Sequence, residues 1–104
     1  MIIHESINFE DVTVMMPELK VCFRGNDIHL SLTQLRLLMI FLSDPYGRFT
    51  SEELIRQMEL FSKPHLNVVV THLRKQLDQK YIFTVRGFGY AFALESHSQK
   101  EKSL

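Results

Sequence analysis

The order of β-type and helical segments limits this 104-residue chain to a small number of folds. Residues 1–30 contain short apolar runs separated by polar breaks, a pattern typical of short antiparallel strands. The glycine and asparagine in segment 24–27 tolerate the positive φ of a tight turn, so this segment is expected to close a hairpin. The predicted strands are residues 7–9, 12–16, 21–23 and 28–30.

Two helices are predicted after these strands from capping-box spacings. Ser31 and Gln34 stand three residues apart, so their side chains can each satisfy a free amide at a helix start. Residues 35–42 are apolar on nearly every side, which indicates a helix buried among several neighbours. Thr50 and Glu53 repeat the spacing and predict the start of a second, amphipathic helix.

A third helix is expected from about residue 65 to residue 79, after the Lys63-Pro64 break. At about 100° per residue, four apolar side chains fall on one face, which should pack against the core. They are Leu66, Val70, Leu73 and Leu77. The opposite face is unusual because its hydrogen-bonding and basic side chains have no acidic partner nearer than Asp78. Its members are Val68, Thr71, His72, Lys75 and Gln79.

The last predicted element is a second hairpin, with strands at residues 82–85 and 90–94. Its turn is formed by residues 86–89, where Phe88 is expected either at the exposed tip or as an aromatic plug of the core. Residues 95–104 lack periodicity and are predicted to form a loose tail after a single domain, residues 1–94. Strands, three helices and a hairpin in this order predict an α+β winged helix-turn-helix fold.

The third helix and the second hairpin carry side chains suited to DNA. In helix-turn-helix units the last helix lies in the major groove, where lysine can meet phosphates or guanine edges and valine can meet the thymine methyl group. An arginine at a hairpin tip suits the negative minor groove, and neighbouring glycines let the backbone approach. The candidates are Val68, Thr71, His72 and Lys75 for the major groove, Lys63, His65 and Arg74 for phosphates, and Arg86 and Gly87 for the minor groove.

Each of these features has a simpler explanation when it is taken alone. A polar helix face is usually only solvated, and glycines in a hairpin are usually turn residues. The prediction of DNA binding therefore depends on their occurrence together in one order. Because a base- or phosphate-facing imidazole binds better when charged, His72 also predicts recognition that depends on pH.

The charge distribution gives two conflicting indications. The formal net charge is zero, whereas nucleic-acid-binding domains usually carry excess Lys and Arg. Residues 1–62 hold five basic and nine acidic side chains, while residues 63–90 hold five basic and one acidic. This segregation indicates that a polyanion would meet the later segment. A winged-helix module that binds protein and has little affinity for DNA is therefore the alternative.

Enzyme, metal and membrane functions find little support in the sequence. The five histidines show no zinc-ligand spacing, and neither a Gly-rich phosphate loop nor a nucleophile constellation is present. No catalysis, metal, cofactor or small-molecule substrate is therefore expected. Cys22 lacks a partner for an internal disulfide and is expected inside a strand as a small apolar residue. No apolar run approaches the ~20 residues of a membrane span and no signal peptide is evident, so the expected location is the cytoplasm.

The second hairpin also resembles a known family motif. Residues 84–90 (TVRGFGY), preceded by residues 73–77 (LRKQL), are similar to the signature of OmpR/PhoB-type effector domains, the output modules of bacterial two-component response regulators. The resemblance covers about residues 7–94. It implies an N-terminal four-stranded sheet, three helices and a C-terminal hairpin, in a transcription regulator that binds direct repeats of double-stranded DNA head to tail.

The resemblance also implies a role for individual positions. Val68 and His72 would face bases, Arg74 and Thr84 would meet phosphates, and Arg86 would enter the minor groove. These roles agree with those drawn from the residues themselves, except that Thr84 is added.

Three positions depart from the family pattern. Thr71 and His72 stand where many members have arginines, and Pro64 stands at another commonly basic position. Because the salt dependence of DNA binding scales with the number of neutralised phosphates, the departures predict weaker phosphate attraction and a smaller salt slope. The family loop that can touch RNA polymerase corresponds to residues 60–64, which is a shorter link than usual.

Overall fold

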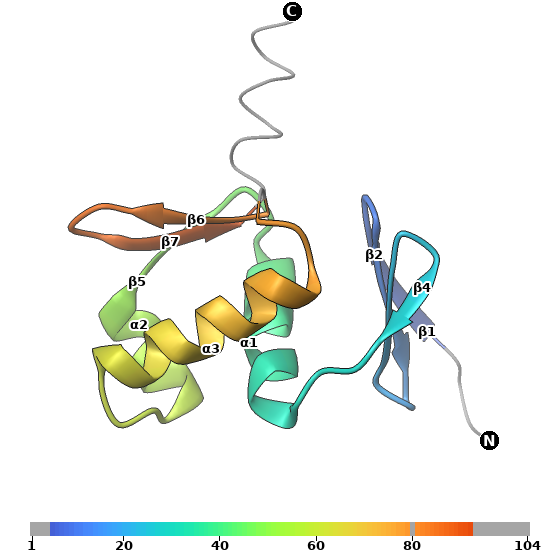
Figure 1. Cartoon of the computed structure of the whole chain (residues 1–104), viewed down its shortest axis with the longest axis horizontal. Coiled ribbons are helices and arrows are strands. Elements are labelled where there is room, and N and C mark those ends of the chain that lie inside the picture. The colour runs from blue at the N-terminus through green and yellow to red at the C-terminus, as the bar shows by residue number, and fades with distance from the viewer. Residues whose placement is uncertain (1–4, 80, 93–104) are drawn as a thin grey trace, which may run out of the picture. The chain divides into compact units, whose positions relative to one another are not determined.

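The computed structural model describes residues 5–79 and 81–92 (Figure 1). The chain divides into two compact units, Met1–Leu30 and Ser31–Leu104. The first unit is built of strands only, and the second contains the helices and a small sheet. The predicted tail, residues 95–104, lies outside the described residues.

The first unit is the four-stranded antiparallel sheet that the family resemblance implies. Its strands are β1 (Glu5–Phe9), β2 (Val12–Met16), β3 (Lys20–Phe23) and β4 (Asn26–Ile28), paired in that order. Side chains on a strand alternate between the two faces of a sheet, so paired residues share a face. The pairs Val12↔Phe23 and Val14↔Val21 are accordingly all buried.

The turn between β3 and β4 is tighter than the sequence predicts. The fourth strand begins at Asn26, so the prediction of a strand at residues 28–30 is wrong at both ends. Only two residues form the turn, Arg24 with φ +52° and Gly25 with φ +81°. Two successive positive φ values give a hairpin turn whose twist matches that of the strands it joins. Asn26 and Asp27 are therefore free to pair with β3.

Cys22 lies inside β3 as predicted, but it is not an apolar core residue. Its side chain is half-exposed, and its thiol donates a hydrogen bond to Asp27 Oδ1 at 3.1 Å. This hydrogen bond raises the pKa of the Cys22 thiol, because the carboxylate stabilises the protonated form. The other oxygen of Asp27 pairs with Lys20 Nζ at 3.2 Å. Cys22 therefore belongs to a surface polar cluster on the sheet.

The first two helices begin at the predicted caps. Helix α1 (Leu32–Ser43) has the full capping box, with Ser31 Oγ accepting from the Gln34 amide at 3.2 Å and Gln34 Oε1 accepting from the Ser31 amide at 3.1 Å. Helix α2 (Ser51–Met58) is capped by Thr50, whose hydroxyl accepts from the Glu53 amide at 3.0 Å. The Glu53 carboxylate instead accepts from Arg56 and Gln57 in the next turn of α2.

Helix α3 (Lys63–Gln76) starts and ends earlier than predicted. Ser62 is its N-cap and accepts from the His65 amide at 3.4 Å, so Lys63 and Pro64 are the first two helical residues rather than a break. Proline is tolerated there because the first amides of a helix have no partner within it. The helix ends before Leu77, which has φ −93° and ψ −134°, so the prediction that Gln79 lies on its outer face is wrong.

A three-stranded sheet completes the second unit, in the order β5-β7-β6. Strand β6 (Ile82–Val85) has the predicted bounds, whereas β7 (Gly89–Phe92) begins one residue earlier than predicted. The predicted end of the last strand, residues 93 and 94, lies outside the described residues. Strand β5 (Arg48–Thr50) was not predicted, because it is defined by its pairing with β7, which is far away in sequence.

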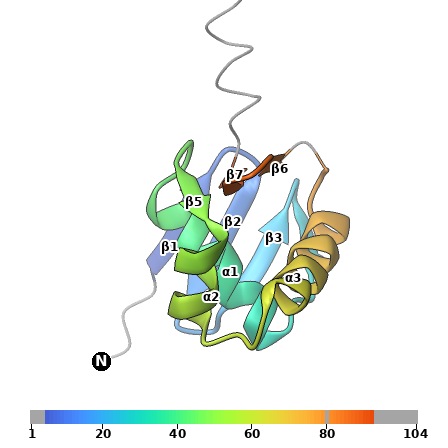
Figure 2. The same cartoon turned by 90° about the vertical axis from the view of Figure 1, so that its left-hand side faces the viewer.

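The core of the second unit is formed where the three helices meet the β5-β7-β6 sheet. Phe41 of α1 stacks on Phe92 of β7 with ring centroids 5.3 Å apart, and meets Phe49 of β5 edge-on at 5.5 Å. The predicted inner face of α3 is buried, including Leu66, Val70, Leu73 and the following Leu77. Helices α2 and α3 lie side by side beneath the β6–β7 hairpin (Figure 2). This packing is the winged helix-turn-helix arrangement.

Candidate nucleic-acid interface

The predicted recognition face of α3 is exposed. Thr71, His72 and Lys75 are exposed, and Val68 retains 51% of its accessible surface. Their placement follows from the helical period, since the buried residues of α3 occupy the opposite face. The structure therefore brings all four major-groove candidates onto one side of one helix.

The tip of the β6–β7 hairpin is exposed as well. Arg86, Gly87 and Phe88 form its three-residue turn, with Gly87 at φ +72° and the Phe88 amide donating to the Val85 carbonyl at 2.9 Å. Phe88 is 43% exposed, so it lies at the tip and does not plug the core. The tip points to the same side of the unit as the N-terminal end of α3 (Figure 1).

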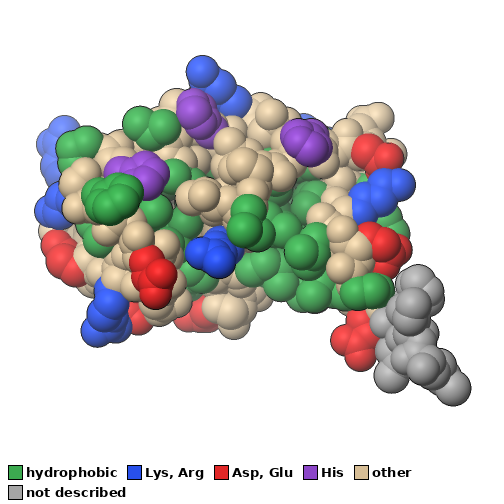
Figure 3. Space-filling model, turned by 90° about the horizontal axis from the view of Figure 1, so that it is seen from below, with side chains coloured by type: hydrophobic (Ala, Val, Ile, Leu, Met, Phe, Trp, Pro, Cys, Tyr) green, Lys and Arg blue, Asp and Glu red, His purple; other side chains and the backbone are tan. Residues whose placement is uncertain are grey.

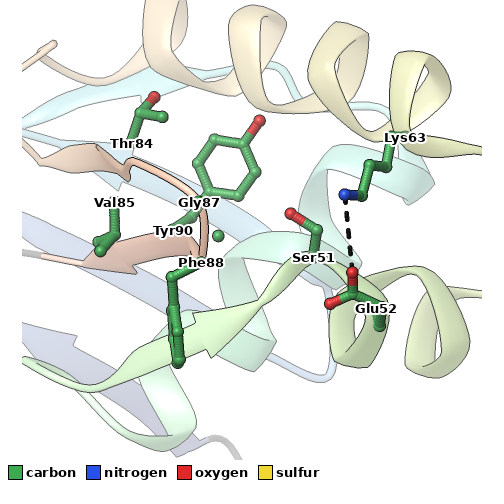
Figure 4. Close-up of a pocket in the computed structure, with 9 residues that line it drawn as sticks. Ser51, Glu52, Lys63, Thr84, Val85, Gly87, Phe88 and Tyr90 are labelled. Atoms are coloured by element: carbon green, nitrogen blue, oxygen red, sulfur yellow. Dashed lines mark ion pairs between the residues drawn. The ribbon is translucent and has the colours of Figure 1, made fainter.

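A polar pocket of about 160 Å³ separates this tip from the start of α3. Three predicted DNA contacts line it, Lys63 from α3, Thr84 from β6 and Gly87 from the turn. Ser51 and Glu52 close it from the start of α2, and Tyr90 forms the wall on the β7 side (Figure 4). Lys63 Nζ lies 3.6 Å from Glu52 Oε1, and both side chains are largely exposed.

The side chains of Arg74 and Thr84 are hydrogen-bonded to each other. The Arg74 Nε atom donates to the Ile82 carbonyl at 3.1 Å, and Nη2 donates to Thr84 Oγ1 at 3.3 Å. Arg74 is half-buried. The two predicted phosphate contacts therefore connect the last turn of α3 to β6, a structural role that the sequence did not indicate.

A second connection joins α3 to the hairpin near the other end of the helix. The buried Tyr90 on β7 donates its hydroxyl hydrogen bond to Oδ1 of Asn67, which is exposed on α3. Burial raises the pKa of Tyr90, against a smaller opposing effect of Arg74, so the hydroxyl keeps the proton that it donates. Sequence reasoning missed Asn67, although it stands one helical turn before Thr71.

His65, a predicted phosphate contact, lies near the start of α3 with its ring partly covered. Its ring stacks on Phe61 with centroids 5.9 Å apart, and its Nδ1 atom is buried without a hydrogen-bond partner among the described residues. Phe61 is 93% exposed, in the link between α2 and α3. His65 is therefore only half-exposed, beside an exposed aromatic ring that sequence reasoning did not single out.

Basic side chains do not form a continuous patch on the face seen in Figure 3. Lysine, arginine and histidine alternate there with acidic, apolar and uncharged side chains. Among residues 5–79 and 81–92, no group of three histidine, cysteine or acidic side chains is placed to hold a metal ion. None of the helices in those residues is long and apolar enough to cross a bilayer.

Comparison with known proteins places this geometry in a family. Residues 25–92 match the family model described as transcriptional regulatory protein, C terminal. A probable transcriptional regulatory protein of Picosynechococcus sp. is 33% identical over 93 residues, which cover 81% of this chain and 37% of that protein. The KDP operon regulator KdpE of Escherichia coli is 30% identical over 98 residues, covering 85% and 43% respectively. The chain thus spans less than half the length of these relatives.

Solved structures with the same fold include DNA-binding domains of response regulators. The DNA-binding domain of Klebsiella pneumoniae RstA, solved with the RstA box, matches with a TM-score of 0.77 at 23% identity, over 88% of this chain and 99% of that one. The C-terminal domain of the nisin resistance regulator NsrR matches with a TM-score of 0.73 at 28% identity, over 85% and 96%. The chain therefore belongs to the family of C-terminal domains of transcriptional regulatory proteins, the OmpR/PhoB type of winged-helix DNA-binding domain.

Proposed function

We propose that the chain binds specific double-stranded DNA sequences as the effector domain of a bacterial response regulator. The observation that carries this proposal is the double connection between α3 and the hairpin. Arg74 joins α3 to β6, and Asn67 joins α3 to Tyr90 on β7. The exposed face of α3 and the exposed tip with Arg86 therefore belong to one rigid surface, which can reach two adjacent grooves of a duplex.

The exposed side of α3 suits the major groove. Val68 offers methyl groups for a thymine methyl, and Lys75 can donate to guanine edges or phosphates. Thr71 and His72 are shorter hydrogen-bonding groups that can approach base edges closely. The absence of acidic side chains among these four residues supports their placement against DNA.

The pocket between α3 and the hairpin suits the sugar-phosphate backbone. Glu52 competes with a phosphate for the Lys63 ammonium there, so the net contribution of Lys63 is reduced by the ion pair. Thr84 can still donate its hydroxyl proton while it accepts from Arg74. Arg74 already donates two hydrogen bonds within the protein, so its main role is to connect α3 to β6.

The hairpin tip suits the minor groove. Arg86 is exposed, and no described residue holds it by a hydrogen bond or ion pair, so its guanidinium is available to the negative potential of a narrow groove. Gly87 beside it has no side chain, which lets the backbone come close to the duplex.

A salt titration tests the proposal against the alternative of a protein-binding winged helix. Binding to a duplex selected by the chain from a random library should weaken linearly on a log–log plot as salt rises. A shallow slope is expected, because Pro64, Thr71 and His72 stand at positions where many family members have basic residues. If the chain binds no duplex from the library even at low salt, the protein-binding alternative replaces the proposal.

His72 should make DNA binding depend on pH. A protonated imidazole on the exposed face of α3 attracts a polyanion more strongly than a neutral one, so affinity should fall from about pH 6 to about pH 8. The drop should disappear in His72→Gln and persist in His65→Gln, because His65 is half-exposed and stacked on Phe61. Equal affinities of the unmodified chain at the two pH values would remove His72 from the interface.

We also infer the arrangement of the whole regulator from the family. Binding to direct repeats would place two domains head to tail, as a tandem dimer on DNA.

The exposed Phe61 ring in the link between α2 and α3 is the feature that a contact with RNA polymerase would use. The cytoplasmic location expected from the sequence stays a prediction.

A further inference from the structure

We propose that Asn67 is an additional DNA contact, which donates a hydrogen bond from its amide nitrogen to a backbone phosphate and is positioned for this by Tyr90. The proposal rests on the proposed DNA-binding function and adds to it a residue that sequence reasoning did not select. It follows from the side of α3 on which Asn67 lies and from the orientation of its amide group.

Asn67 lies on the side of α3 that faces the hairpin. With Leu66 as the zero of a helical wheel, Asn67 falls at about 100° and Arg74 at about 80°. Arg74 is bonded to β6 and Asn67 to β7, so this side of the helix runs along the hairpin. Asn67 is nevertheless exposed, at the edge between the hairpin and the recognition face.

A phosphate backbone is the part of a duplex that would lie over this edge. If α3 lies in the major groove and the Arg86 tip lies in the adjacent minor groove, one sugar-phosphate strand must pass between them. The polar pocket with Lys63 and Thr84 lies along the same boundary. Asn67 therefore faces phosphate oxygens rather than base edges.

The amide of Asn67 is turned so that it presents donors. Its Oδ1 atom accepts the hydrogen bond of the Tyr90 hydroxyl, which leaves the two N–H groups of Nδ2 on the other branch of the amide. Among the described residues, none accepts a hydrogen bond from Nδ2. An anionic phosphate oxygen is a strong acceptor for such a donor, and a side chain already held in place loses little entropy when it binds.

The substitution Asn67→Asp tests the orientation directly. Aspartate has nearly the same shape and keeps an acceptor for Tyr90, but it replaces the outward N–H groups with a carboxylate oxygen. We expect Asn67→Asp to weaken binding to a mixed-sequence duplex and to a library-selected duplex, each by at least about tenfold at low salt. Asn67→Ala should weaken both by about tenfold without changing the salt slope, because a neutral contact is lost.

Two further variants separate this role from a structural one. Gln76→Ala removes another exposed amide from the same helix, on the side away from the hairpin, and should leave both affinities unchanged. Tyr90→Phe keeps the packed ring but removes the hydrogen bond to Asn67. If Asn67 only ties α3 to the hairpin, adding Asn67→Ala to this variant should cause no further loss of affinity, whereas a phosphate contact predicts a further loss. Thermal unfolding of each variant confirms that it is folded.

The possible failures are distinguishable. If the unmodified chain binds neither duplex at low salt, the proposed function and this inference fall together. If it binds both and folded Asn67→Asp binds equally well, only the inference is overturned. A loss confined to the selected duplex would also overturn it, because a phosphate contact should affect all sequences alike.

Discussion

Replacing Gly89 with alanine is expected to lower the free energy of unfolding by about 3 kcal/mol, the upper range for forcing atoms into a packed site. Gly89 opens β7 and pairs with Thr50 of β5. A Cβ atom at this position would overlap the Phe49 carbonyl oxygen and come within 2.8 Å of the Ser51 amide nitrogen. Both obstacles are backbone atoms, so a change of side-chain rotamer cannot relieve the clash. Urea unfolding followed by circular dichroism measures the effect.

Gly87→Ala is the matched control for this substitution. A Cβ atom at Gly87 would meet nothing within 4 Å, and its only cost is the strain of φ +72°. We expect a loss of about 1 kcal/mol, the usual cost of a left-handed conformation for a residue other than glycine. If Gly89→Ala were no more destabilising than Gly87→Ala, the backbones of β5 and β7 could not be as close at Gly89 as described above.

Replacing Arg86 with alanine is expected to weaken specific DNA binding by roughly 1 to 3 kcal/mol, about fivefold to 150-fold, and to leave unfolding unchanged. Arg86 is exposed at the turn, so its removal disturbs no packing. Its loss should matter most on duplexes with narrow, A·T-rich minor grooves, where the negative potential is strongest. Fluorescence anisotropy with a library-selected duplex gives the affinity.

Arg56→Ala is the control for the loss of one positive charge. Arg56 is exposed in the last turn of α2 and paired with Glu53 at 2.8 Å, and it belongs neither to α3 nor to the hairpin. This variant should bind DNA almost as well as the unmodified chain. An Arg86→Ala variant that folds and binds with unchanged affinity would exclude the hairpin tip from the interface.

The sequence predicted best those elements whose signal is local. The capping box at Ser31 fixed the start of α1, and the β-type run of β6 fixed both of its ends. The start of α3 was placed too late because Lys63-Pro64 was interpreted as a break, although Ser62 caps the helix before it. Strand β5 was missed because its three residues are stabilised by pairing with β7, which is far away in sequence.

The same distinction applies to the candidate site. The exposed face of α3 and the Arg86 tip could be predicted because helical period and turn composition determine which side chains point outward. The partners of Arg74, Thr84 and Tyr90 could not, because each bond joins residues eight to twenty-three positions apart. Asn67 has no unusual feature until its partner on β7 is known.

The two connections between α3 and the hairpin have a consequence for selectivity in the proposed complex. They fix the separation of the two reading elements, so the protein cannot adjust it to suit each duplex. A duplex whose grooves are spaced differently must bend or twist to make both sets of contacts, and the elastic energy of that distortion depends on base sequence. Base pairs that no side chain touches can therefore influence which promoter is bound.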